Sequence, residues 1–318
     1  LFPWGSCPPK GQFAGANIAD QSFRILYGEK PVRSKRNEQF YIDWNYKDGY
    51  SATSPVGMFP KSPAVHQYQL FDMAGNAREW TQDVFDKHAY DYRAFSAVKN
   101  PFVSDANLCI RPDCKRVVRG GSWADGCCHQ RIDTAAGRDI RTETRVAVKE
   151  GSADDRTGFR LACYLNQETS GPDENSNRSS YYIEESPQLP HVPSIPSVQA
   201  DRLREIPAGV FTMGTNEKSA SIAAQPMHPV YLGRFWISSM EVTKGEFETF
   251  TKETGYVSTS SGCYLIGDDT RVSTQHGWFD TNFTQANDHP VVCVTWEDAT
   301  AFALWIDAIV GDKWNCSL

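Results

Sequence analysis

The chain has 318 residues, 40% of them hydrophobic and 12% aromatic, which suffices for the core of one large domain or two smaller ones. Its formal net charge of −7 argues against general nucleic-acid binding, because such binding needs a basic face to meet the phosphates. We expect no membrane span, since the best apolar stretch, residues 302–310, is too short to cross a bilayer and contains Asp307.

Residues 1–165 are dense in Gly, Pro, Asn and Asp, and apolar residues at helical spacing are rare among them. KRVVRGGSW (115–123) predicts a strand that leads into a Gly-Gly turn, and TGFRLACYL (157–165) predicts a second strand. Residues 166–200 are rich in Pro and Ser and poor in apolar side chains. Such a segment buries too little surface to offset the entropy of ordering, so we interpret it as an extended linker.

Two helices are predicted in the part that follows the linker, residues 201–318. EIPAGVFTMGT (205–215) and HPVYLGRFWISSMEVT (228–243) predict short strands before them. The first helix begins after Thr243 as its cap and ends at Gly255, and the second begins after Thr295 and ends before Gly311. Few regular elements between many loops indicate an α+β fold.

Cysteine usage favours an oxidising compartment. The nine cysteines are Cys7, Cys109, Cys114, Cys127, Cys128, Cys163, Cys263, Cys293 and Cys316. This number is high for a cytosolic protein of this length, so we expect disulfides and an extracytoplasmic location. Sequons at Asn177, Asn282 and Asn315 would permit glycosylation in a secretory pathway.

Motifs on both sides of the linker share one resemblance. FTMGT (211–215), HPVYLGRFWISSMEVTKGEF (228–247) and HPVVCVTWEDATAFALWI (289–306) lie after it. LFPWG (1–5), SPVGMFP (54–60), LFDMAGNAREWTQD (70–83), VVRGGSW (117–123) and TGFRLAC (157–163) lie before it. The chain thereby resembles the sulfatase-modifying-factor, or formylglycine-generating enzyme, family. That resemblance implies a variant of the C-type-lectin-like fold.

The two halves stand in reversed order relative to that family. Residues 1–165 resemble the C-terminal half of the domain and residues 201–318 the N-terminal half. In the family a helix-bearing segment joins the point where this chain stops, WNCSL, to the point where it starts, LFPWG, and that segment is absent here. Two interpretations remain: a window on a tandem array of domains, which we favour because the chain begins at Leu1 inside a motif, or a single permuted domain. In either case the halves are complementary.

Calcium is the metal that the resemblance implies. Asp72 and Glu79 flank a Gly-containing loop, and calcium takes six to eight oxygens from carboxylates and turn carbonyls. The family's site maps onto Asp72, Glu79 and the carbonyls of Gly75 and Ala77; the alternative is a plain turn capped by Asp72. A second site maps onto Asn17, Asp48 and the carbonyls of Ile18 and Tyr50; the alternative is two ordinary turns.

The Gly-Gly-Ser turn marks where the family's catalytic centre would lie. Catalytic members carry one cysteine three residues after the serine and another five residues further on, and use them with copper to oxidise a substrate cysteine to formylglycine. Ser122 matches the serine, but Asp125 and Gln130 occupy the two cysteine positions. Cys127 and Cys128 lie between them, and adjacent residues of an extended segment point in opposite directions. We therefore expect no catalysis here, with Ser122, Cys127 and Cys128 as the weak candidates if there is any.

The other cysteines look structural. We expect Cys109 to pair with Cys114 across a short turn, and Cys263 with Cys293 across an insert, although connectivity does not follow from sequence. Arg78 stands where the family has an active-site tryptophan.

The sequence thus predicts a divergent, non-catalytic, calcium-stabilised domain that binds a protein or peptide partner outside the cytoplasm. One alternative is a copper-dependent oxidase that generates formylglycine in a sulfatase-type substrate. Another is a relative of the iron-dependent sulfoxide synthases.

Overall fold

The computed structural model describes residues 15–27, 46–59, 68–93, 98–104, 109, 114–126, 140–165, 202–218, 220–266, 272–311 and 314–318. Several sequence predictions lie outside these residues, among them LFPWG, Cys127, Cys128, Gln130 and the linker 166–200.

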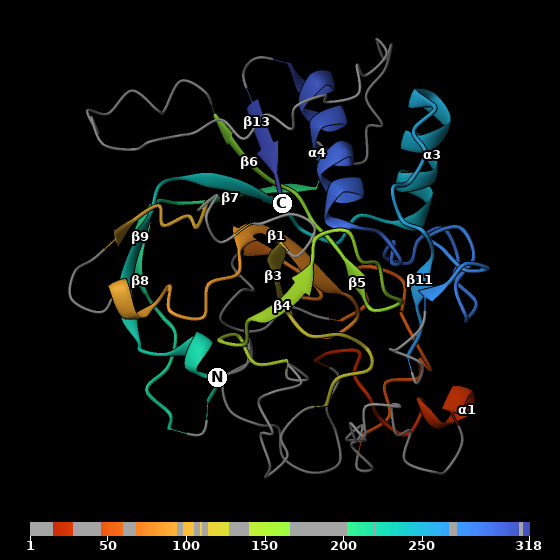
Figure 1. The fold of residues 1–318 in the computed structure, drawn as a ribbon, viewed down its shortest axis with the longest axis horizontal. Helices are drawn as coiled ribbons and strands as arrows, with labels where there is room; N and C mark the ends of the chain where they lie inside the picture. Colours follow the sequence, from red (N-terminus) through yellow and green to blue (C-terminus); the bar gives the residue numbers. More distant parts are fainter. Residues whose placement is uncertain are drawn as a thin grey trace.

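The structure is α+β with short strands and much irregular chain, as the sequence predicted (Figure 1). The first half contributes α1 (Arg24–Tyr27), β1 (Arg78–Val84), η2 (Asp91–Arg93), β2 (Val98–Lys99), β3 (Lys115–Arg119), β4 (Val146–Lys149), β5 (Thr157–Gly158) and β6 (Ala162–Leu165). The second half contributes β7 (Leu203–Ile206), β8 (Gly209–Met213), η5 (Ile222–Ala224), β9 (His228–Leu232), β10 (Phe235–Ser238), α3 (Lys244–Thr254), β11 (Cys263–Tyr264), β12 (Val272–Ser273), α4 (Trp296–Val310) and β13 (Trp314–Ser317).

Both long helices begin and end at the predicted residues, because their caps are local. The Thr243 hydroxyl accepts the Glu246 N–H while the Glu246 carboxylate accepts the Thr243 N–H, and Gly255 ends α3 in the left-handed conformation at φ 69°. Thr295 and Asp298 form the same reciprocal pair at the start of α4. None of the helices in the described part of the chain has the length and hydropathy of a membrane-spanning segment.

The two halves of the chain build shared sheets. One four-stranded sheet has the order β13-β6-β10-β7, so β6 from the first half lies between two strands of the second. Strand β2 of the first half also pairs in parallel with β9 of the second. The other four-stranded sheet, β4-β3-β1-β5, comes from the first half alone, and β11 and β12 form a small hairpin. The complementary halves therefore fold together.

The segment 157–165 corrects one prediction, because it forms two strands rather than one. β5 pairs with β1, whereas β6 pairs with β10 and β13, so the chain passes from one sheet to the other between them. At the crossing the carbonyls of Phe159 and Leu161 accept the N–H groups of Val242 and Ser238. A period-two pattern does not reveal that a strand changes sheets.

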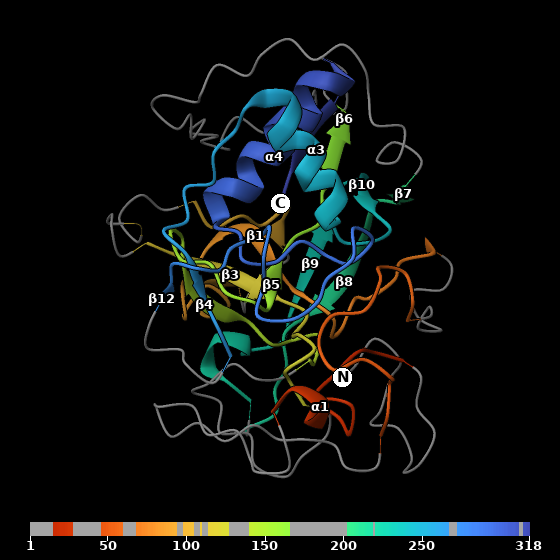
Figure 2. The same cartoon turned by 90° about the vertical axis from the view of Figure 1, so that its right-hand side faces the viewer.

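The largest core also draws on both halves. Helices α3 and α4 lie side by side along one side of the sheets (Figure 2), where Phe250 and Phe302 meet at 5.5 Å between ring centroids. Phe159 of the first half packs on Phe302 at 5.4 Å, and the indole of Trp80 donates to the Val294 carbonyl. Burial of such rings is the main favourable term in folding, so each half depends on the other for its core.

Candidate functional site

The Gly-Gly-Ser turn is closed by Asp125. The Asp125 carboxylate accepts the N–H of Ser122 at 2.8 Å and its hydroxyl at 2.7 Å, and both residues are buried. Gly121 precedes them at φ 69°, and a Cβ there would lie 2.5 Å from Ile140 Cγ2, so only glycine fits the turn. Copper(I) prefers soft sulfur ligands, and a carboxylate held by two donors does not supply one. The residue at this position does not fit a copper ion.

Arg78 is held in a buried ion pair. Its guanidinium donates to the Thr157 hydroxyl at 2.8 Å and pairs with the Asp154 carboxylate. Burial alone would raise the pKa of Asp154, but the guanidinium groups of Arg78 and Arg156 outweigh it and hold that pKa below its usual value. Arg78, which stands at the position of the family's active-site tryptophan, is thus engaged in a buried ion pair within the protein.

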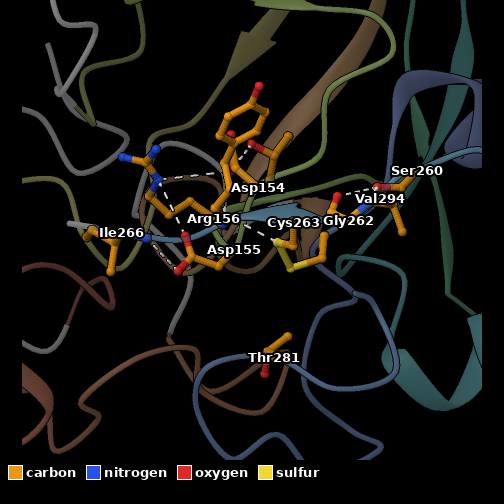
Figure 3. The surroundings of a disulfide bond; sticks show 12 residues. Asp154, Asp155, Arg156, Ser260, Gly262, Cys263, Ile266, Thr281 and Val294 are labelled. Atoms are coloured by element: carbon orange, nitrogen blue, oxygen red, sulfur yellow. Dashed lines mark hydrogen bonds and ion pairs between the residues drawn. A yellow bond between two sulfur atoms is a disulfide. The ribbon is translucent and has the colours of Figure 1, made fainter. Parts of the chain in front are cut away.

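The disulfide between Cys263 and Cys293 lies close to Asp154 and the adjacent Asp155 (Figure 3). The Cys293 N–H donates to the Asp154 carbonyl at 2.9 Å, and the Asp155 carboxylate accepts the Ile266 N–H at 2.9 Å. The insert that carries Cys263 is therefore fixed to the first half both by backbone and by side-chain hydrogen bonds.

Three disulfides are present in the described residues. Two are the expected pairs, Cys109–Cys114 and Cys263–Cys293. The third, Cys163–Cys316, was not predicted. Its cysteines stand directly opposite one another on β6 and β13, so it could be foreseen only by knowing that these strands of different halves pair.

In the loop Asp72 to Glu79, both carboxylates already have donors. Asp72 accepts the N–H groups of Gly57 and Phe59 at 2.5 and 3.3 Å, and burial raises its pKa to about 6. Glu79 makes a bidentate pair with Arg160, with contacts of 2.6 to 2.9 Å. Glu79 is therefore held in an ion pair rather than solvated.

Backbone contacts fix the rest of this loop. A Cβ on Gly75 would lie 2.2 Å from the Asn17 carbonyl oxygen, so glycine is needed for the close approach. That same carbonyl accepts the Asn76 N–H at 2.8 Å. Ala77 follows with its N–H bound to a residue of the other half, Glu241. The two predicted calcium loops thus touch each other through Asn17.

Glu241 is a site residue that sequence reasoning missed. Its carboxylate accepts the Ala77 N–H at 3.0 Å and the Asn76 side-chain amide at 2.9 Å, and it is fully buried. Burial, together with the charges of Asp72 and Glu79, raises the pKa of Glu241 well above its usual value. The only sequence signal was a carboxylate between apolar residues in SSMEVT.

The second predicted calcium loop brings two carboxylates together. Asp48 accepts the N–H groups of Ile18 at 3.0 Å and Tyr50 at 2.7 Å, while the Asp20 carboxylate accepts the Asp48 N–H. Burial and the adjacent charge of Asp20 raise the pKa of Asp48 to about 7. Two such carboxylates without a cation between them repel one another.

Asn17 adds a further oxygen. Its side-chain amide donates to the Ala52 carbonyl at 2.8 Å and to Asn76 Oδ1 at 3.1 Å, whereas its own Oδ1 is buried and has no donor among the described residues. An unsatisfied buried oxygen is uncommon, and a hard cation is one way to satisfy it. Asn17, Asp48 and the unpredicted Asp20 therefore supply side-chain oxygens of the kind that calcium takes.

Comparison with known proteins gives the family. The family model of the sulfatase-modifying factor enzyme 1-like domain matches residues 13–165 and 191–314. The chain belongs to this family. The resemblance drawn from its motifs and the fold expected from it are confirmed. The reversed order of the halves, and the choice between a tandem array and a permuted domain, stay predictions.

Relatives of this sulfatase-modifying-factor-type chain include both an enzyme and an inactive protein. Formylglycine-generating enzyme of Bos taurus is 28% identical over 127 residues, which cover 31% of this chain and 34% of the relative. Inactive C-alpha-formylglycine-generating enzyme 2 of Bos taurus is 33% identical over 116 residues, or 36% of this chain and 28% of the relative. Formylglycine-generating enzyme of Streptomyces coelicolor is 30% identical over 127 residues, which cover 31% of this chain and 40% of the relative. The matches therefore span about a third of each relative.

Proposed function

We propose that the chain is a non-catalytic member of its family that binds a protein or peptide partner outside the cytoplasm. The carrying observation is Asp125. The position where a catalytic member needs a thiolate holds a buried carboxylate, and both of its short hydrogen bonds go to Ser122. Removing that carboxylate would leave the Ser122 donors unsatisfied, which makes Asp125 a structural part of the turn.

The surroundings support this role. The Arg78–Asp154 pair lies where the family's tryptophan would be, and it is itself tied to Thr157. Three disulfides among the described residues fit an oxidising compartment. Folds of this kind present variable loops on a rigid frame, and binding is the function that such a frame serves without catalysis.

Copper titration tests the absence of catalysis. We expect the purified chain not to bind copper(I) stoichiometrically against a chromogenic competitor. The matched variant D125C/Q130C restores cysteines at both family positions and should gain copper affinity, whereas D125S/Q130S removes the same native groups without adding thiols. Tight stoichiometric binding by the parent chain that is lost in C127A/C128A would overturn the proposal in favour of the copper-dependent oxidase.

Calcium is the second part of the proposal, and the loop of Asn17, Asp20 and Asp48 is where we expect it to bind. When bound there, the ion would neutralise the two carboxylates and satisfy Asn17 Oδ1. Calcium at Asp72 and Glu79 stays a prediction, since those carboxylates are held by Gly57, Phe59 and Arg160.

A calcium chelator should lower the melting temperature of the parent chain, and added calcium should restore it. D48N should lose this response, because it removes one carboxylate of the loop, while D72N should keep it. An identical melting curve with chelator and with calcium would refute the proposal for this loop.

A further inference from the structure

The sequon Asn282–Phe283–Thr284 lies in an irregular turn before α4, where buried and exposed residues alternate. Thr281 and Phe283 are 6% and 8% exposed, whereas Asn282 and Thr284 are exposed. Neither Asn282 nor Thr284 has a side-chain hydrogen bond to any other residue that the structure describes. Both side chains of the sequon are therefore exposed and make no hydrogen bond to the described part of the chain.

The buried residues Thr281 and Phe283 anchor this turn to the core. The Thr281 hydroxyl donates to the Phe283 carbonyl at 2.6 Å, and Thr281 lies across the Cys263–Cys293 disulfide from Asp154 in Figure 3. The Phe283 ring packs edge-on against Trp123 at 5.2 Å. With its two neighbours anchored in the core, Asn282 projects outward without any repacking of the protein.

The sequon at Asn315, the other one in the described residues, lacks this arrangement. Asn177 lies outside the described residues. Asn315 is exposed but belongs to strand β13, and the next residue, Cys316, is bonded to Cys163 in the register of the sheet. Of the two sequons that the structure describes, the one at Asn282 alone combines an exposed acceptor, an exposed hydroxyl and a position between regular elements.

We propose that Asn282 is an N-glycosylation site when the chain passes through a eukaryotic secretory pathway; this rests on the extracytoplasmic location in the proposed function. The side-chain nitrogen Nδ2 forms a bond to C1 of the first N-acetylglucosamine of a polyprenyl-diphosphate-linked oligosaccharide. The bond between C1 and the diphosphate breaks, the amide loses one proton, and the polyprenyl diphosphate leaves. Thr284 supplies the hydroxyl that defines the acceptor.

The test uses the full 318-residue chain behind a cleavable leader, secreted from insect or mammalian cells. N177Q/N315Q leaves Asn282 as the sole sequon, and in this background we expect one glycan that peptide N-glycosidase removes. Enzymatic release in ¹⁸O water should convert Asn282 to labelled aspartate in the peptide map. T284S should keep the glycan, and T284A and N282Q should each lose it.

Recovery of the secreted, disulfide-bonded chain with Asn282 unmodified would overturn the proposal. T284A and T284S alter only an exposed side chain, so their unfolding midpoints should match the parent after deglycosylation. The supplied leader separates this result from the location itself, because a missing glycan would count against Asn282 even if the native chain is secreted.

Discussion

Removing the disulfide between Cys163 and Cys316 should destabilise the protein more than removing either of the other two described disulfides. The change is C163A/C316A, which deletes both sulfurs from the paired strands β6 and β13. This bond joins the two halves of the chain, whereas Cys109–Cys114 and Cys263–Cys293 each lie within one half.

The magnitude follows from the loops that the disulfides close. The sequence separation is 153 residues for Cys163–Cys316, 30 for Cys263–Cys293 and 5 for Cys109–Cys114. A crosslink stabilises by restricting the unfolded chain, with an entropy that grows as the logarithm of loop length, which gives about 5, about 4 and about 2 kcal/mol respectively. C163A/C316A should therefore lower the free energy of unfolding by about 3 kcal/mol more than C109A/C114A does.

Guanidinium unfolding without reductant, followed by tryptophan fluorescence, measures this difference. C109A/C114A and C263A/C293A are the matched controls, because each removes the same atoms from a shorter loop. The expected order of midpoints is parent, C109A/C114A, C263A/C293A and C163A/C316A. If C163A/C316A unfolded at the midpoint of C109A/C114A or above, the inference that the halves fold as one unit would be wrong.

Three further predictions concern single residues. T295A should lower the free energy of unfolding by about 1 kcal/mol, because the Thr295 hydroxyl caps α4, and T295S should recover most of this loss. Equal urea unfolding midpoints for the parent, T295A and T295S would contradict the capping role. Burial lowers the pKa of His289 below the 6.5 of the unfolded chain, so the contribution of His289 to stability should be complete above pH 6.5 and should decrease as the pH falls below it. H289Q should reduce the dependence of the free energy of unfolding on pH in this range. An unchanged pH dependence would rule His289 out as its source. D154N should cost about 3 kcal/mol or more at neutral pH, because it leaves the buried guanidinium of Arg78 without its carboxylate. Since the pKa of Asp154 is lowered in the fold, the parent should lose this stabilisation as the pH falls below 3.8, and D154N should not. If D154N had the same unfolding midpoint as the parent at neutral pH, the stabilising role of the buried pair would be refuted.

The helices were predictable because their determinants are close in sequence. Thr243 and Thr295 each act on a residue three positions later, and Gly255 ends α3 by its own backbone conformation. Cys109 and Cys114 are likewise near neighbours. The family motifs indicated the fold, and the family model to which they point matches residues 13–165 and 191–314.

The parts that could not be predicted depend on contacts between distant segments. Glu241 meets Ala77 across 164 positions, and Arg78 meets Asp154 across 76. The sequence identified Asp125 as the residue in place of a cysteine, but only the folded turn shows that its carboxylate holds Ser122. Asp20 was not predicted because its contact with Asp48 spans 28 positions of the sequence.

The location of the Cys163–Cys316 bond has a consequence for proteolysis. The predicted linker 166–200 lies between the two bonded cysteines, so a single cut within it yields two polypeptides that remain covalently joined. Such a nicked protein would migrate as one species on a non-reducing gel and as two after reduction. Once cut and reduced, it becomes a two-subunit complex of its own halves, and its melting temperature should then rise with protein concentration.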